Sequence, residues 1–157
     1  MKDRKLIIGY GNPLRGDDGV GWEVASRLAA AIPSDAAHIL TVHQLTPELA
    51  EPVSEADLVI FIDASDVGEP GTWRCDQAKP RCASGNSIGH HFDVAGLLAY
   101  SEAVFKASPR ALIVSIAVES FDFQDHLAPG VEAALPEVID YIRKIVCGAG
   151  LNLSAKK

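Results

Sequence analysis

The sequence lacks the features that mark secreted and membrane proteins. Its three cysteines, Cys75, Cys82 and Cys147, are an odd number without a Cys-x-x-Cys pair, which argues against a disulfide framework and a zinc knuckle. We expect free thiols, with a redox pair between Cys75 and Cys82 as the alternative. No apolar run approaches the roughly 18 residues that span a bilayer, and the charged start (MKDRK) leads into a short strand rather than a signal-peptide core. These absences predict a cytoplasmic protein with no membrane partner.

Clustered positive charge is also missing. No basic cluster is longer than Lys156-Lys157, and 14 Lys and Arg against 21 Asp and Glu give a formal net charge of −7. We therefore expect no nucleic acid among the partners. A length of 157 residues with 48% hydrophobic content is typical of one domain with its own core. We predict a single domain over residues 1–157, with its core at about 5–146 and a frayed tail at 148–157.

Apolar periodicity predicts strands that alternate with helices. Strands are expected at residues 6–9, 37–43, 57–63 and 111–118 with an edge strand at 72–76, and helices from residue 20, from 47, from about 92 and over 131–146. The run at 58–62 (LVIFI) has no polar interruption, which is typical of a central parallel strand buried on both faces. The pattern predicts an α/β fold: a mostly parallel sheet with helices on both faces.

A glycine-rich loop that ends in two acids, residues 9–21 (GYGNPLRGDDGVG), joins the first strand to the first helix. The dinucleotide fingerprint requires a third glycine where Leu14 stands. A phosphate loop requires Lys and Ser or Thr where Asp17 and Asp18 stand, and these acids would repel a phosphate. A nucleotide-binding enzyme is therefore disfavoured. Two carboxylates here suit a metal cation or proton transfer, and the alternative is that Asp17 caps the helix.

Other metal-binding side chains are predicted at the same edge of the sheet, because ligands of α/β proteins bind beyond the carboxyl ends of the strands. Asp63 closes the third strand, His90 and His91 open a helix, and Glu119 ends the last strand. Two carboxylates and an imidazole would make an O,O,N site for a borderline divalent ion with positions open for substrate. Spacing does not choose between the two histidines, and the alternative is that Asp63 caps a turn and the histidine is structural.

Four segments in this order resemble the hydrogenase maturation endopeptidases. They are residues 9–21, residues 60–64 (IFIDA), residues 91–94 (HFDV) and residues 118–120 (VES). The resemblance extends from about residue 5 to residue 145. It implies a nickel-dependent endopeptidase that removes a C-terminal extension from the large-subunit precursor of a nickel-iron hydrogenase, once nickel has been inserted.

The resemblance also implies roles for single residues. It places the metal-contacting carboxylates on Asp18 and Asp63 and the histidine on His91. The family also carries Glu at the first of these positions, so the shorter Asp18 would hold the metal closer to the loop. Asp17 matches a common family acid, and we predict that Asp17 and Asp18 are catalytic, with Asp17 in proton transfer. Gly11 and Asn12, where the backbone can pass close to a ligand, are the predicted substrate contacts.

The implied partner is the nickel-loaded precursor, and the nickel is expected to arrive held by cysteines of that substrate. We expect the enzyme to act on it as a monomer. The sequence has no Gly-x-Ser-x-Gly elbow and no other nucleophile beside a base, so the predicted chemistry is metal-assisted amide hydrolysis. The alternative function is a non-proteolytic chaperone that binds the nickel-loaded large subunit through Asp18, Asp63 and His91.

Overall fold

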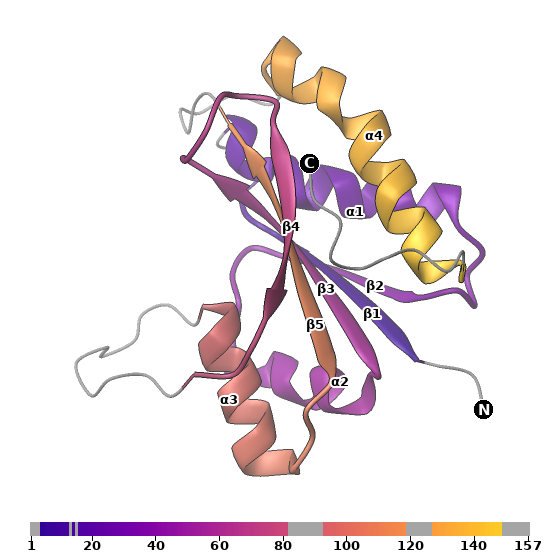
Figure 1. Cartoon of the computed structure of the whole chain (residues 1–157), viewed down its shortest axis with the longest axis vertical. Coiled ribbons are helices and arrows are strands. Elements are labelled where there is room, and N and C mark those ends of the chain that lie inside the picture. The colour runs from indigo at the N-terminus through magenta and orange to yellow at the C-terminus, as the bar shows by residue number, and fades with distance from the viewer. Residues whose placement is uncertain (1–3, 13, 15, 82–92, 119–126, 149–157) are drawn as a thin grey trace.

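The chain folds around one five-stranded sheet (Figure 1). The structure is a computed structural model, and it describes residues 4–12, 14, 16–81, 93–118 and 127–148. The strands are β1 (Lys5–Tyr10), β2 (His38–Val42), β3 (Leu58–Ser65), β4 (Trp73–Ala78) and β5 (Arg110–Ala117). The helices are α1 (Val20–Ala31), α2 (Ala50–Glu55), α3 (Val94–Phe105) and α4 (Pro129–Val146), with short 3-10 turns η1 (Gly16–Gly19) and η2 (Pro47–Leu49).

The sheet order is β2-β1-β3-β5-β4, and every neighbouring pair is parallel except β4 with β5. The predicted α/β class with a mostly parallel sheet is therefore confirmed, and β4 is the edge strand expected near residues 72–76. One boundary was wrong: Asp63 does not close its strand. β3 continues to Ser65, because β5 keeps pairing with it as far as Ser65 with Ala117.

Helices cover both faces of the sheet, as the sequence predicts (Figure 1). Side chains of β3 alternate between the two layers: Ile60 and Ile62 face the cluster that contains α1 and α4, whereas Val59 and Phe61 face the cluster that contains α2 and α3. All four of these side chains are fully buried. β3 is thus the central strand that its uninterrupted apolar run indicates.

Two glycines let α1 lie directly against the sheet. A Cβ added to Gly9 of β1 would overlap the carbonyl oxygen of Gly21 and lie 2.7 Å from the Cβ of Ala25. A Cβ added to Gly21 would overlap the carbonyl oxygen of Ile62 and lie 2.8 Å from that of Tyr10. The first turn of α1 therefore rests on the backbone of β1 and β3, and this contact fixes where the intervening loop begins and ends.

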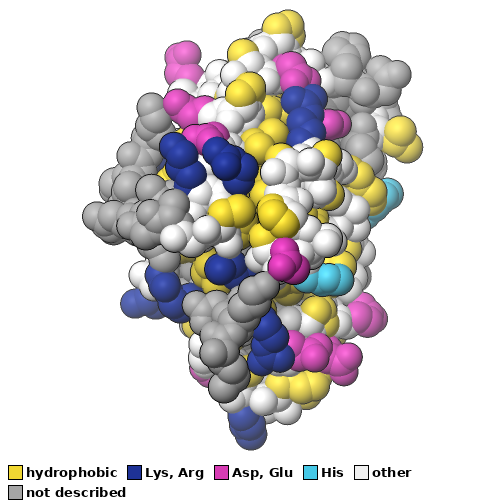
Figure 2. All heavy atoms as spheres, turned by 90° about the vertical axis from the view of Figure 1, so that its right-hand side faces the viewer, with side chains coloured by type: hydrophobic (Ala, Val, Ile, Leu, Met, Phe, Trp, Pro, Cys, Tyr) yellow, Lys and Arg dark blue, Asp and Glu magenta, His cyan; other side chains and the backbone are white. Residues whose placement is uncertain are grey.

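Charges are mixed on the side of the molecule that carries β2 and α4. Figure 2 shows Lys and Arg side chains lying among acidic and apolar ones, without a continuous basic patch on this face. Arg27 of α1, for example, contacts Glu132 of α4 through both terminal guanidinium nitrogens, at 2.6 and 3.0 Å. None of the described helices is long and apolar enough to cross a bilayer.

We predict that Gly9→Ala destabilises the protein by about 3 kcal/mol or more, because the new methyl group meets backbone that cannot move away. The matched control is Gly130→Ala in the first turn of α4, where a Cβ would lie 3.9 Å from its nearest neighbour, the carbonyl oxygen of Pro70. Urea unfolding of the two variants measures the difference. Equal stabilities would show that α1 does not need this close approach.

Candidate active site

The two predicted metal-binding carboxylates lie at the switch point of the sheet. The chain passes from β1 to β2 on one side and then to β3 on the other side of β1, with β5 and β4 beyond it in the sheet, so strand order reverses between β1 and β3. Ligands of α/β proteins bind in the crevice outside the carboxyl ends of the strands at such a point. The glycine-rich loop follows β1, and Asp63 lies within the last three residues of β3.

The loop after β1 holds the Asp18 carboxylate. Gly11 has φ 139° and donates its N–H to Val42 O at 3.1 Å, and a Cβ there would overlap the carbonyl oxygen of Asp18. The loop turns back at this point, so Asn12 N donates to Asp18 Oδ2 at 2.9 Å. Asn12 Oδ1 accepts from Leu14 N at 2.9 Å. Gly11 and Asn12 therefore shape the loop, and their contact with substrate stays a prediction.

Asp63 is a partly buried carboxylate on the face of the sheet covered by α2 and α3. It is two residues after Phe61 on β3, and every second side chain of a strand points to the same face. Burial raises the pKa of Asp63 to about 6. Hydrogen bonds from the Tyr10 hydroxyl and the Ala64 N–H oppose this rise, and the negative charge of Asp18 adds to it. Asp18 is therefore near enough to Asp63 for its charge to act on that carboxyl.

Tyr10 interacts with Asp63 and also lies within reach of the charge of Asp93, the residue before α3. Burial raises the pKa of the Tyr10 hydroxyl far above its ordinary value, and the charges of Asp63 and Asp93 raise it further. Asp93 is the N-cap of α3, and its Oδ1 accepts from Gly96 N at 2.7 Å. Asp18 of the turn η1, Asp63 of the strand β3 and Asp93 at the cap of α3 therefore come from three separate elements, and Tyr10 is influenced by the charges of the last two.

The structure brings together Asp18 and Asp63 of the predicted site. Over the described part of the chain, no group of three or more metal-binding side chains gathers in one place. His90, His91 and Glu119 lie outside the described residues, and Asp17 is described only in its backbone, within η1. Gly19 is the N-cap of α1, so neither acid of the loop occupies that cap position.

Sequence reasoning missed Tyr10 and Asp93 as neighbours of the site. The signal for Tyr10 was present: it continues the alternation of Leu6 and Ile8 and brings a hydroxyl to the carboxyl end of a buried strand. Asp93 stands directly before a helical apolar pattern, which is typical of an N-cap. The cysteines follow expectation in part, because Cys75 and Cys147 are free and Cys82 lies outside the described residues.

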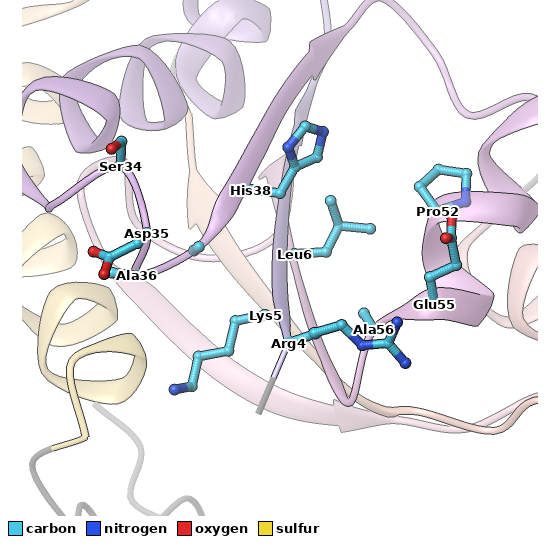
Figure 3. Close-up of a pocket in the computed structure, with 11 residues that line it drawn as sticks. Arg4, Lys5, Leu6, Ser34, Asp35, Ala36, His38, Pro52, Glu55 and Ala56 are labelled. Atoms are coloured by element: carbon cyan, nitrogen blue, oxygen red, sulfur yellow. The ribbon is translucent and has the colours of Figure 1, made fainter. Parts of the chain in front are cut away.

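Two of the hollows in the described surface are relevant to the predicted site. One of about 400 Å³ is at the amino ends of β1 and β2, where Arg4, His38 and Glu55 are among its lining residues, and it includes none of the predicted site residues (Figure 3). The other, of about 180 Å³, is lined by residues that include Ser65 and Ser115. Ser115 pairs in register with Asp63, but neither Asp63 nor Asp18 lines this smaller hollow.

No protein-family model matches the chain, and no curated protein matches it by sequence. Solved structures do match. A [NiFe] hydrogenase maturation protease, HycI, from Thermococcus kodakarensis has a TM-score of 0.76 at 22% identity, over 94% of each chain. The hydrogenase maturating endopeptidase HybD from E. coli has a TM-score of 0.76 at 23% identity, over 94% of each chain.

A hydrogenase 2 maturation peptidase from a Thaumarchaeota archaeon has a TM-score of 0.68 at 22% identity, over 92% of this chain and 98% of its own. The chain thus has the fold of hydrogenase maturation proteases over nearly its whole length. The resemblance drawn from the four sequence segments is confirmed at the level of the fold.

We predict that Asp63→Asn stabilises the metal-free protein at pH 8. The folded pKa of about 6 lies above the ordinary 3.8, so the folded state binds the proton more tightly, and stability falls as pH rises from 4 to 6. The variant removes a buried charge and should gain on the order of 2 kcal/mol at pH 8 and almost nothing at pH 4.

Urea unfolding with a chelator present, at pH 4 and pH 8, measures this difference. The control is Asp140→Asn on α4, an exposed carboxylate that pairs with Arg143 and Lys144 at 2.7 and 2.9 Å and whose pKa those partners lower. It should show no gain at pH 8. A loss of stability in Asp63→Asn at pH 8 would contradict the assignment of Asp63 as a buried, strained charge.

Proposed function

We propose that the protein is a nickel-dependent endopeptidase that removes the C-terminal extension of a nickel-iron hydrogenase large-subunit precursor after nickel insertion. The observation that carries the proposal is the convergence of Asp18 and Asp63 at the switch point of a sheet shared with hydrogenase maturation proteases. A cytoplasmic location and a monomeric enzyme remain predictions that accompany it.

The two carboxylates have the chemistry of an incomplete cation site. Each oxygen pair can donate to a borderline divalent ion. Burial chiefly raises the pKa of Asp63 and the charge of Asp18 adds to the rise, and positive charge between the two carboxylates would relieve this repulsion. Asp18 has one oxygen, Oδ2, engaged by Asn12 N, which holds the carboxylate in place for a ligand. Two protein ligands suit an ion that arrives already held by the substrate, because they leave most coordination positions to it.

His91 is the proposed third ligand. Chain continuity supports it, since residue 91 is two residues from Asp93 and two residues span at most about 7 Å. Asp93 is close enough to the site for its charge to act on Tyr10. His91 would add the nitrogen donor that completes an O,O,N set with Asp18 and Asp63.

The chain's own residues would orient the ion and the scissile amide. Nickel bound with the substrate would supply Lewis-acid polarisation of that amide. Asp17, next to Asp18 in η1, is the proposed proton carrier for the attacking water and the leaving amine. The hollow at Ser65 and Ser115 would receive the adjoining peptide segment, beside the exposed side chain of Val67.

The test is the intact mass of a large-subunit precursor, nickel-loaded or nickel-free, after incubation with the full chain. We expect loss of a C-terminal peptide from the loaded precursor alone. Asp18→Asn and Asp63→Asn should lower kcat/KM by more than about 100-fold, because each removes a ligand. Asp35→Asn is the matched control, since it removes a carboxylate from the hollow at the opposite end of the sheet.

The outcomes separate the two functions. Cleavage of nickel-free precursor at the same rate would contradict the dependence on nickel. Stable binding of loaded precursor with no change in its mass would instead favour the chaperone alternative. Equal activity of Asp18→Asn and Asp35→Asn would remove the two-carboxylate site from the mechanism.

A further inference from the structure

We infer that Tyr10 is a positioning residue for the site: its hydroxyl donates a hydrogen bond to the Asp63 carboxylate and fixes the direction in which that carboxylate presents its free oxygen. The inference rests on the proposed function for its purpose, because it assigns a role in presenting Asp63 to a bound cation. The contact itself, Tyr10 with Asp63, is a property of this chain with or without metal.

The sheet register places the two side chains next to each other. Gly9 of β1 pairs with Ile62 of β3, so Tyr10 and Asp63 are level on neighbouring parallel strands. Residues that are level in a parallel pair point to the same face, and both belong to the face that carries Phe61, α2 and α3. The strand geometry therefore places the two side chains side by side, in agreement with the hydrogen bond between the Tyr10 hydroxyl and Asp63.

The Tyr10 ring packs on the apolar layer, and the backbone of Tyr10 and of the next residue is held by close contacts. It packs against the apolar cluster that contains Ile8 and Phe61. Its own carbonyl oxygen lies so close to Gly21 that a Cβ there would be only 2.8 Å away, and the next residue, Gly11, is bonded to Val42 O at 3.1 Å. Because its backbone is fixed and its ring packs on this cluster, Tyr10 can serve as a fixed reference for the carboxylate.

Asp63 needs such a reference because its surroundings disfavour a charged carboxylate at this place. Asp18 repels it across the crevice, and burial disfavours its charge. The Ala64 N–H and the Tyr10 hydroxyl are the donors that oppose these effects. Groups that hold a metal ligand in orientation contribute to metal affinity although they do not touch the ion, typically by a factor of about 10 to 100.

The experiment compares Tyr10→Phe with Tyr141→Phe in the full-length protein. Both changes remove one phenolic oxygen and keep the ring. Tyr141 is a suitable control because it belongs to α4 on the other face of the sheet, with its ring 5.0 Å from that of Trp73 and its hydroxyl against Cys75. Asp63→Asn serves as the reference for loss of the ligand itself.

Two readouts are taken. Crystal structures of the metal-free proteins at pH 8 report the Asp63 side-chain torsions, and calorimetric titration with nickel chloride reports affinity. We expect a single Asp63 conformer in the wild type and in Tyr141→Phe, but a rotated or split carboxylate in Tyr10→Phe. Nickel affinity should fall about 10- to 100-fold in Tyr10→Phe and by less than twofold in Tyr141→Phe.

An unchanged Asp63 conformer in Tyr10→Phe, or nickel affinity equal to that of Tyr141→Phe, would overturn the positioning role. Failure of the proposed function looks different. If Asp63→Asn binds nickel as tightly as the wild type does, the proposed metal site loses its support. If neither protein binds free nickel, the Asp63 conformers alone decide whether Tyr10 orients this carboxylate.

Discussion

The close contact between the first turn of α1 and the backbone of β1 and β3 determines how the rest of the site is arranged. It exists because Gly9 and Gly21 have no side chains. The backbone of the helix therefore lies directly on the backbone of the strands, whereas a layer of side chains normally separates a helix from a sheet. With both ends of the loop held in this way, residues 10–20 have little room and must turn sharply, which Gly11 allows with φ 139°. The position of Asp18 over the end of β1 is the result.

Most of the fold could be predicted from the sequence because its strands are strongly apolar and its helices strongly periodic. The run at 58–62 identified the central strand, and Pro47 correctly marked the start of a short helix. Strand order and the end of β3 could not be predicted, since both depend on pairing between distant segments. Asp63 reads as a strand end in the sequence, but pairing with Ser115 keeps it inside β3.

The candidate site was predictable only as far as a motif marks it. The resemblance gives Asp18 and Asp63 a role, and the charge of Asp18 acts on Asp63 in the structure, whereas Tyr10 lies within the segment 9–21 without an implied role and is found only through the β1–β3 register. Asn12 illustrates the converse. Its place in the motif suggests a ligand contact, yet its backbone N–H and side-chain oxygen are both used to hold the loop, through Asp18 and Leu14. The motif therefore identifies Asn12 as a residue of the site but does not predict which of its atoms make contacts.

The two carboxylates come from opposite layers of the molecule. Asp18 precedes α1, which packs on one face of the sheet, while Asp63 and Tyr10 project from the other face toward the layer of α2 and α3. Among the residues that the structure describes, the buried apolar side chains of the two layers form two separate clusters. A ligand bound by both acids would link the two layers at the edge of the sheet. Binding would therefore couple the stabilities of the two apolar clusters and reduce the motion of one layer relative to the other.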